Sequence, residues 1–238
     1  MPVRKFHSML CTVVIMAAMF VVIDKELAND SKTISKVPTN QKVVALTIDD
    51  GPHKRVTPEI LAILKDKKVK ATFFVLGTNV ENSPTILAQE VADGHEIGVH
   101  AYNHPSLPKL SDKKIEEEFE KAEAVILPIT EKPTLFRPPG GAFNERVLRI
   151  AKQRGYQVIL WSIDTRDWAC PPEKKIIDAV FNEVKPGSII LMHDGQYPIP
   201  TPHALGTIID GLHERGYTFV TVSELLHYNE VGHTFPRL

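Results

Sequence analysis

The chain has 238 residues, of which 43% are hydrophobic and 24% are charged, enough apolar material for a folded core and too much for a mainly disordered chain. Lys and Arg total 28 against 29 Asp and Glu, a formal net charge of -1, so no positive field favours a nucleic acid as a partner. The two cysteines exclude a disulfide framework, because Cys11 lies in an apolar leader and leaves Cys170 without a partner.

The first predicted element is an N-terminal export signal. Arg4 and Lys5 precede an apolar run over residues 9–23, and charged residues close that run. The run is shorter than the ~17 to 25 residues of a membrane-spanning helix, and no clear small-residue cleavage site follows it. Residues 1–23 are therefore either a signal peptide or an uncleaved signal-anchor. We expect an exported protein, secreted or attached to the outer face of the cytoplasmic membrane and facing the cell wall.

Three further parts follow the leader. Residues 24–41 are polar, contain Pro38 and show little periodicity, which is typical of a tether. A single folded domain is predicted over residues 42–228, followed by a C-terminal tail over residues 229–238. The sequence predicts no second domain and no protein partner.

Within residues 42–228, short runs rich in Val, Ile and Phe alternate with helical patterns. The predicted strands are residues 43–48, 71–76, 96–99, 135–136, 157–161, 188–192 and 218–221. Helix boundaries lie between them at Thr57-Pro58, Ser83-Pro84, Gly94, Asn144 and Gly155. This alternation predicts an α/β fold, either a doubly wound sheet or a barrel. We favour a distorted (β/α) barrel of about seven strand-helix units. No glycine-rich fingerprint follows the first strand, so a nucleotide cofactor is not expected.

Polar residues follow five of the predicted strands, at the carboxyl ends where α/β folds hold their active sites. They are Asp49-Asp50-Gly51-Pro52, then His100 and His104, then Arg137-Pro138-Pro139-Gly140-Gly141, then Asp164 and Asp167-Trp168, and finally His193-Asp194-Gly195. Each motif alone has a structural explanation. Asp-Asp-Gly-Pro is a common turn, His193 could be a satisfied core histidine, and Arg137 could be an ion-pair partner. Their joint placement at strand ends favours a functional site.

The residue types at this rim are typical of a metal-dependent hydrolase. The His-x3-His spacing predicts a helical turn with both imidazoles on one side, about 5 to 6 Å apart at Cβ. One carboxylate and two imidazoles are a usual open catalytic zinc set, which leaves a position for water. Of two adjacent carboxylates, one can bind a metal while the other accepts a proton, and His193 could protonate a leaving amine.

The five motifs resemble those of the polysaccharide deacetylase family, carbohydrate esterase family four, whose domain is called the NodB-homology domain. The resemblance covers residues 42–228. Its matching segments are Thr47-Ile48-Asp49-Asp50-Gly51-Pro52, His100-Ala101-Tyr102-Asn103-His104, Arg137-Pro138-Pro139-Gly140-Gly141, Asp164-Thr165-Arg166-Asp167-Trp168 and Leu191-Met192-His193-Asp194. It implies a distorted barrel that hydrolyses acetyl groups from a glycan and releases acetate.

The resemblance also implies individual roles. Asp50, His100 and His104 would hold Zn²⁺ or another divalent ion such as Co²⁺, and Asp49 would be the general base. His193 would be the general acid, Asp167 would tune His193, and Arg137 would hold Asp49 in place. The residues that bind substrate would be Pro138, Gly140, Trp168 and Leu191. A backbone N–H near Gly140 would face the oxyanion.

Three positions depart from the family's common pattern: Ile48 replaces an aromatic residue, Ala101 a Ser or Thr, and Gly140 a frequent Tyr. None of these positions is a metal ligand or an acid-base group. The missing hydroxyl at Ala101 predicts weaker support for the metal site, and Gly140 predicts a more mobile loop.

The favoured function is a metal-dependent N-deacetylase of N-acetylglucosamine polymers, with peptidoglycan preferred to chitin-type oligomers because of the leader. An O-deacetylase of acetylated xylan needs the same water, base and acid and stays open as an alternative. A catalytically weak sugar-binding relative of the same fold is a further alternative, against which the intact set of polar residues argues. An amidohydrolase of another barrel family typically has a His-x-His pair, and the ten histidines contain none.

Overall fold

The structure is a computed structural model that describes residues 33–229. The predicted export signal, the first part of the tether and residues 230–238 lie outside the described residues, so those assignments stay predictions. Between residues 33 and 229, none of the helices combines the length and the apolar character that a membrane span requires.

Within residues 33–229, eight parallel strands form one sheet. They are β1 (Val43–Asp49), β2 (Thr72–Val75), β3 (Glu96–Val99), β4 (Leu135–Phe136), β5 (Gln157–Val158), β6 (Ile163–Asp164), β7 (Ile189–His193) and β8 (Thr218–Val220). The order along the sheet is β5-β4-β3-β2-β1-β7-β6. The strand β8 pairs with the first residues of β1, whereas β2 pairs with the last ones. The long central strand β1 therefore pairs with the last of these strands at its start and with the second strand at its end.

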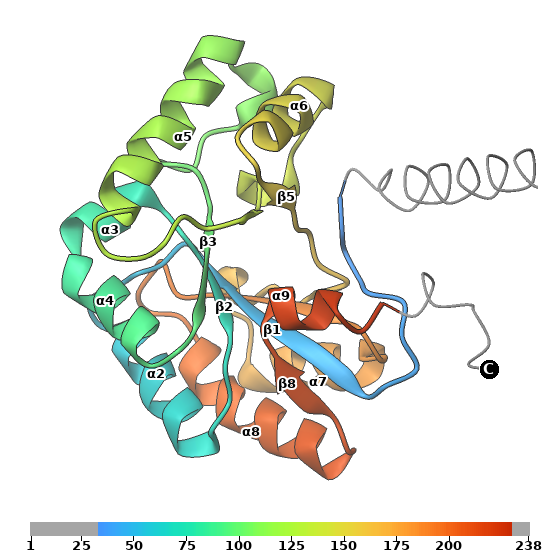
Figure 1. The fold of residues 1–238 in the computed structure, drawn as a ribbon. Coiled ribbons are helices and arrows are strands. Elements are labelled where there is room, and N and C mark those ends of the chain that lie inside the picture. The colour runs from blue at the N-terminus through green and yellow to red at the C-terminus, as the bar shows by residue number, and fades with distance from the viewer. Residues whose placement is uncertain (1–32, 230–238) are drawn as a thin grey trace, which may run out of the picture. The chain divides into compact units, whose positions relative to one another are not determined.

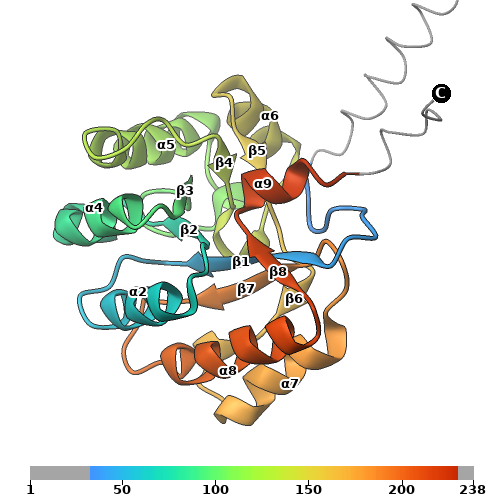
Figure 2. The same ribbon diagram turned by 60° about the horizontal axis from the view of Figure 1, so that its bottom comes forward.

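The sheet curls into a half-barrel, which confirms the predicted α/β barrel class (Figures 1 and 2). Its path ends at β5 and β6, and within residues 33–229 no strand pairing closes the gap between them. The short strand β6 was not predicted, because residues 157–161 read as one apolar strand. In the structure this segment changes partners: Ile159 donates its N–H to Phe136 beside β4, and Ser162 donates to Ile189 in β7.

The helices lie around the sheet in Figures 1 and 2. They are α2 (Val56–Lys67), α3 (Gly77–Asn82), α4 (Pro84–Ala92), α5 (Asp112–Ile126), α6 (Glu145–Gln153), α7 (Glu173–Glu183), α8 (Thr201–Glu214) and α9 (Val222–Leu226). The described part of the chain also contains the short 3₁₀ turns Leu107–Lys109, Pro139–Gly141 and Asp167–Ala169. Local sequence fixes several helix starts, since the side chains of Ser111 and Asn144 accept backbone N–H groups at the first turns of α5 and α6.

Strand alternation divides the core into two clusters. In β1, Val44, Leu46 and Ile48 pack in the larger cluster with the helices, whereas Val43 and Ala45 pack in the smaller one with α9 residues such as Val222. Because side chains in a strand point alternately to opposite faces, Thr47 and Asp49 continue the face of Val43 and Ala45. The same argument places Leu191 and His193 on the face of Ile189, and Arg137 on the face of Leu135. The alternation thus directs several polar side chains into the half-barrel.

Part of the predicted tether belongs to the folded unit. Ile34 donates its N–H to Val158 at 2.9 Å and accepts from Leu160 at 2.7 Å. Val37 donates to Gly187 at 3.0 Å, and only 2% of its surface is exposed. The ordered contacts therefore begin several residues before position 42.

Candidate active site

Three predicted metal ligands meet at the carboxyl end of the sheet. Asp50 follows β1, and His100 and His104 follow β3. The Nε2 atoms of His100 and His104 lie 3.4 Å and 3.5 Å from Oδ1 of Asp50. One ligand atom from each of the three residues lies within 4.8 Å of the other two. The sequence prediction of an Asp-His-His cluster is therefore matched by the geometry.

The segment between the two histidines is not the predicted helical turn. Ala101 and His104 both have left-handed backbone conformations, with φ of 65° and 61°. The rings of His100 and His104 face one another across this irregular loop, with centroids 5.2 Å apart. The carboxylate of Glu118 on α5 accepts backbone N–H groups from this loop, at Tyr102 (3.0 Å) and Asn103 (3.1 Å). A buried carboxylate from another element thus replaces the regular hydrogen bonds of a helix.

The cluster has the properties that a divalent cation requires. Nδ1–H of His100 donates to the carbonyl oxygen of Arg137 at 2.8 Å, which leaves Nε2 facing Asp50. Burial, opposed by Asp50 and assisted by His104, lowers the pKa of His100 to about 3, so its ring is neutral and can act as a ligand. Oδ1 of Asp50 is buried and has no hydrogen-bond partner among the described residues. Such an orphaned oxygen between two imidazole nitrogens fits a bound cation, so these three residues form a candidate metal site.

Asp49 lies beside this cluster and is held by Arg137. Nη1 of Arg137 contacts Oδ1 of Asp49 at 2.6 Å and Oγ1 of Thr47 at 2.8 Å. The guanidinium is fully buried, and it also donates to the carbonyl oxygens of Ile159 and Leu160. The other carboxylate oxygen of Asp49, Oδ2, lies 3.8 Å from Nε2 of His100. Asp49 therefore turns one oxygen to Arg137 and the other toward the candidate ligands.

The pKa of Asp49 follows from this setting. Burial raises it above the ordinary value of 3.8, while the charge of Arg137 and its hydrogen bond oppose the increase. Asp49 is thus a carboxyl group more basic than one in water, which suits a proton acceptor.

His193 at the end of β7 forms a second pair with Asp167. Nδ1 of His193 lies 2.7 Å from Oδ1 of Asp167, and the backbone N–H of His193 donates to Oδ2 at 2.8 Å. Asp167 is fully buried and also accepts the hydroxyl of Thr201 at 2.6 Å. Burial alone would lower the pKa of His193, but the hydrogen bond and charge of Asp167, together with Asp49 and Asp50, raise it to about 9. The ring is therefore protonated at neutral pH, with Nδ1 fixed by Asp167.

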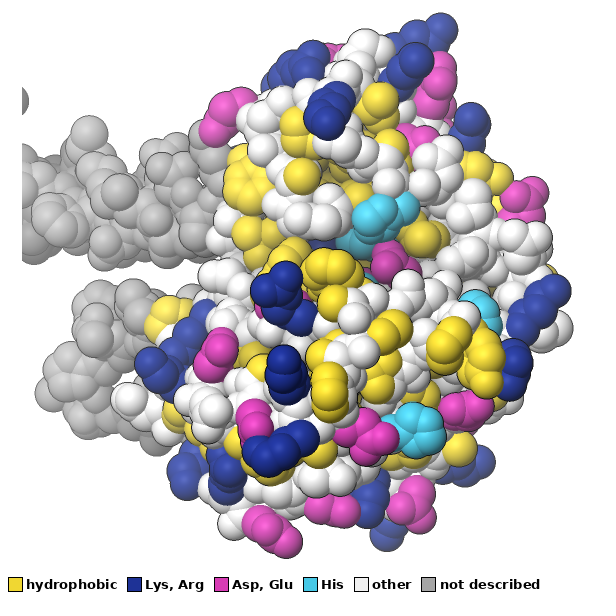
Figure 3. Space-filling model, turned by 180° about the vertical axis from the view of Figure 1, so that it is seen from behind, with side chains coloured by type: hydrophobic (Ala, Val, Ile, Leu, Met, Phe, Trp, Pro, Cys, Tyr) yellow, Lys and Arg dark blue, Asp and Glu magenta, His cyan; other side chains and the backbone are white. Residues whose placement is uncertain are grey.

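A hollow joins the candidate metal site and His193. It is lined by Asp50, Leu76, Asn79, His104, Trp168, His193, Gly195 and Gln196. Trp168 is 47% exposed, as expected of a wall for a ligand. Pro138 and Leu191 are buried, and their predicted roles in substrate binding stay predictions. The space-filling view shows histidine and acidic side chains together near the middle of one face, with hydrophobic side chains around them (Figure 3).

Gly140 occupies a backbone conformation that favours glycine, with φ of 61°. A Cβ at this position would meet nothing within 4 Å, so the space above the loop is open. The N–H groups of Gly141 and Ala142 donate to the carbonyl oxygens of Pro138 and Pro139. These two bonds hold the turn whose exposed apex is Gly140.

The sequence did not single out Asn79 and Thr57 as site residues, and it named Asp194 and Gly195 in a motif without giving them a role. Asn79 donates its amide to the carbonyl oxygen of Asp50 at 2.7 Å, and Gly195 packs so closely that a Cβ there would lie 2.4 Å from Cβ of Asp50. Asp194 is fully buried under this turn, where Thr57 donates its hydroxyl to Oδ2. Burial raises the pKa of Asp194 to about 7, against the hydrogen bond from Thr57 and with the help of the Asp50 charge. Asn79 and Thr57 come from segments distant from Asp194 and carry no local sequence signal of a role at the site.

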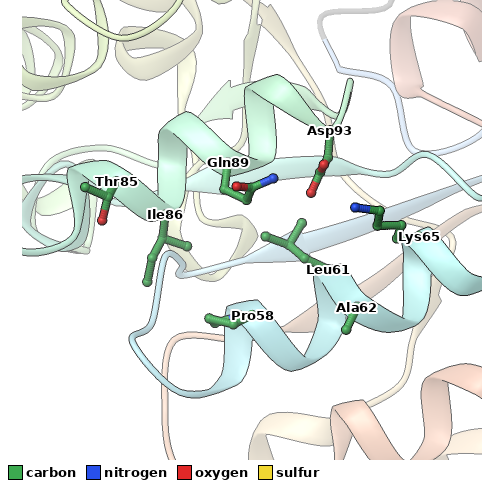
Figure 4. A pocket seen from close by; sticks show the side chains of 8 residues that line it. All are labelled: Pro58, Leu61, Ala62, Lys65, Thr85, Ile86, Gln89 and Asp93. Carbon is green, nitrogen blue, oxygen red and sulfur yellow. The ribbon is translucent and has the colours of Figure 1, made fainter.

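A second hollow lies between α2 and α4 and contains none of the motif residues. It is lined by Pro58, Leu61, Ala62, Lys65, Thr85, Ile86, Gln89 and Asp93, whose side chains point between the two helices (Figure 4). Most of this lining is apolar, and it holds no converging set of acids, bases and ligands. The chemistry-bearing groups are therefore gathered at the strand ends.

Comparisons with known proteins agree with this geometry. The family described as polysaccharide deacetylase matches residues 36–159. A peptidoglycan-N-acetylglucosamine deacetylase of Bacillus cereus is 42% identical over 207 residues, which cover 86% of this chain and 97% of the relative. A chitooligosaccharide deacetylase of Sinorhizobium fredii is 35% identical over 199 residues, covering 78% of this chain and 93% of the relative. A crystal structure of the Bc1960 peptidoglycan N-acetylglucosamine deacetylase has a TM-score of 0.81 at 35% identity and covers 84% of this chain and 95% of its own.

Proposed function

The chain belongs to the polysaccharide deacetylase family, and we propose that it hydrolyses N-acetyl groups from the N-acetylglucosamine residues of peptidoglycan, releasing acetate. The observation that carries this proposal is the orphaned Oδ1 of Asp50 between two imidazole nitrogens, with the free oxygen of Asp49 facing the same space. The relatives from Bacillus cereus and Sinorhizobium fredii support amide hydrolysis on an amino-sugar polymer. Peptidoglycan is preferred because the predicted export signal would place the enzyme at the cell wall.

Asp50, His100 and His104 would hold the divalent ion, for which Zn²⁺ fits a set of one carboxylate and two imidazoles, with Co²⁺ as an alternative. When bound, the ion would lower the pKa of a water molecule and polarise the acetyl carbonyl. The neutral ring of His100 and its contact with Arg137 prepare Nε2 for this role.

Asp49 would accept the proton of the attacking water through Oδ2. Its Oδ1 is bound by Arg137, so the carboxylate cannot rotate away, and the pKa raised by burial makes it a better base. Arg137 acts through Asp49 and holds it in position. A backbone N–H near Gly140 would donate to the oxyanion of the tetrahedral intermediate.

His193 would donate a proton to the leaving amine. The hydrogen bond to Asp167 occupies Nδ1, so Nε2 is the nitrogen that can face the substrate. With a pKa of about 9, the ring carries this proton at neutral pH. Trp168 and Gln196 at the edge of the hollow would contact the sugar.

Acetate release by the full chain tests this proposal. The assay compares N-acetylglucosamine oligomers, peptidoglycan and acetylated xylan, each with added Zn²⁺ and again with a chelator. Chelator-sensitive release from the glucosamine substrates is the expected result. Release from acetylated xylan alone would favour the O-deacetylase, and bound zinc without any release would favour the sugar-binding relative.

The proposal of export is tested by fractionation of the native host. We expect the protein in the envelope or the medium, because of residues 1–23. Its presence only in the cytoplasm would contradict this proposal and leave the enzymatic one standing.

A further inference from the structure

An arginine and a tyrosine from distant segments are joined by a cation-π contact and a hydrogen bond, on segments that adjoin the candidate active site. The guanidinium carbon of Arg55 lies 3.6 Å from the centroid of the Tyr197 ring, and Nη2 donates to the tyrosine hydroxyl at 2.8 Å. Both side chains are exposed, and Tyr197 keeps 50% of its surface accessible. We call these two residues the Arg55–Tyr197 pair.

We infer that the Arg55–Tyr197 pair lies near the hollow, because both of its segments leave residues that line the hollow. Arg55 follows the Asp50 turn and precedes the first residue of α2. Tyr197 comes two residues after Gly195, which lines the hollow and packs against Asp50. Two residues span at most about 7 Å. Gln196 between them donates its amide to the carbonyl oxygen of Trp168 at 2.8 Å, which connects the Tyr197 segment to the exposed Trp168 wall.

The guanidinium of Arg55 is prepared to bind an anion. Within residues 33–229 it forms no ion pair with a carboxylate, and Tyr197 accepts only one of its five N–H groups. The ring supports one face of the guanidinium plane, which leaves the N–H groups along its edge to point into solvent. A planar arginine of this kind matches a carboxylate with two parallel hydrogen bonds, and its fixed position lowers the entropy lost on binding.

The alternative to a role in ligand binding is that the Arg55–Tyr197 pair is a purely structural cation-π contact. An exposed pair of this type contributes little to stability, and it requires no position near the hollow. The unused donors and the proximity to Gly195, Gln196 and Trp168 distinguish the Arg55–Tyr197 pair from such a contact.

We propose that the Arg55–Tyr197 pair is a subsite for a carboxylate carried by the glycan next to the sugar that is deacetylated. This inference rests on the proposed function and narrows its substrate class to anionic glycans. In peptidoglycan the neighbouring sugar bears a lactyl ether, whose acid group is free or continues into a peptide that has carboxylates of its own. Chitin-type oligomers have no such group, so the subsite favours peptidoglycan over neutral glycans.

The test compares kcat/KM of the full chain on three substrates: neutral N-acetylglucosamine oligomers, peptide-free peptidoglycan strands, and strands that keep their peptides. The measured quantity is the ratio of kcat/KM on each anionic substrate to kcat/KM on the neutral oligomers. We expect Arg55→Gln to lower this ratio at least about tenfold, because a charge-assisted pair of hydrogen bonds is lost. A loss on peptide-free strands identifies the lactyl carboxylate as the ligand, and a loss only on peptide-bearing strands identifies the peptide.

Lys54→Gln is the matched control, because it removes the same charge from the adjacent exposed residue. It should keep the wild-type ratio. Tyr197→Leu removes the support of the guanidinium and should lower the ratio less than Arg55→Gln does. Added salt should reduce the ratio in the wild type more than in Arg55→Gln.

The possible failures can be told apart. An active wild type whose ratio is the same in Arg55→Gln and Lys54→Gln would overturn the subsite and leave the proposed function intact. A folded, zinc-loaded wild type that is inactive on all three substrates would overturn the proposed function, and the subsite with it.

Discussion

Oε2 of Glu118 accepts the backbone N–H of Tyr102 at 3.0 Å, and this hydrogen bond ties the loop between His100 and His104 to α5. The loop contains two left-handed residues, Ala101 and His104, and this conformation costs an L-residue about 1–2 kcal/mol. A second bond from Asn103 to the same oxygen and the low exposure of Glu118, 8%, fix the connection. Support for the loop therefore comes from a carboxylate, although position 101 lacks a hydroxyl.

The first prediction concerns metal affinity. Glu118→Ala removes the acceptor of both N–H groups, so His104 loses its fixed position relative to Asp50. We expect divalent metal binding to weaken by about 10- to 100-fold, the usual effect of removing a partner that orients metal ligands. Glu118→Gln keeps an acceptor oxygen and should lose less. Competition with a chromogenic chelator measures these affinities.

Glu116→Ala is the control for this prediction, because Glu116 is an exposed residue of the same helix. It should leave the affinity unchanged. Equal metal affinities in Glu118→Ala and Glu116→Ala would show that the loop keeps its shape without the carboxylate.

The second prediction separates base from ligand. Asp49→Asn should retain the metal and lose at least about 100-fold in turnover, because an amide cannot accept the proton of water. His100→Ala should lose metal affinity, since it removes one of the three candidate ligands. Metal content and acetate release are measured on the same preparations, with circular dichroism to confirm folding, because Asp49→Asn leaves the buried Arg137 without its counter-charge. Equal metal loss in both variants would contradict the separate roles.

The rim of the half-barrel could be predicted from sequence because it follows from strand periodicity. Asp49, Arg137 and His193 each follow or end a short apolar run, and parallel strands bring such ends together. The inward direction of Asp49 and His193 also follows from alternation, since both continue the face of small-cluster residues such as Ala45 and Ile189.

What the sequence did not predict depends on contacts between distant segments. The loop of His100 and His104 is not helical, because Glu118 supplies its acceptor from α5. The strand β6 is a separate strand because its chain crosses the open side of the barrel to β7. Thr201 binds Asp167 across 34 sequence positions, and nothing near either residue indicates the pairing.

The third prediction is a bell-shaped dependence of kcat/KM on pH, with Asp49 required deprotonated and His193 required protonated. Activity should rise with pH as Asp49 ionises and fall as His193 loses its proton near its pKa of about 9. In Asp167→Asn the hydrogen bond and charge that raise this pKa are weakened. The basic limb should therefore move toward the ordinary value of 6.5.

Asp164→Asn is the control for the pH profile, because Asp164 lies on the same rim and accepts from Arg166 instead of His193. Its basic limb should stay at the wild-type position. A wild-type profile without a fall in activity between about pH 8 and pH 10.5, or a basic limb that Asp167→Asn does not move, would refute the assignment of His193 as the acid.

The fourth prediction concerns Glu90 on α4, a carboxyl group outside the catalytic machinery. Glu90 is fully buried, and neither carboxylate oxygen has a hydrogen-bond partner within residues 33–229. Burial, with a contribution from the charge of Asp194, raises its pKa well above 4.5 in the folded protein. The folded chain therefore binds this proton more tightly than the unfolded chain does. Stability must fall as pH rises above 4.5 toward the folded pKa, by about 1.4 kcal/mol per pH unit for one such group.

Glu90→Gln removes this titration while keeping the shape of the side chain. We expect its melting temperature to exceed that of the wild type by more at about pH 8 than at about pH 5, because only the wild type has to bury a carboxylate or bind a proton at high pH. Glu116→Gln makes the same change at an exposed position and should show equal differences at both values. Thermal unfolding followed by circular dichroism measures all three proteins. A gain in Glu90→Gln that is the same at both pH values would mean that Glu90 does not titrate differently in the folded and unfolded chains.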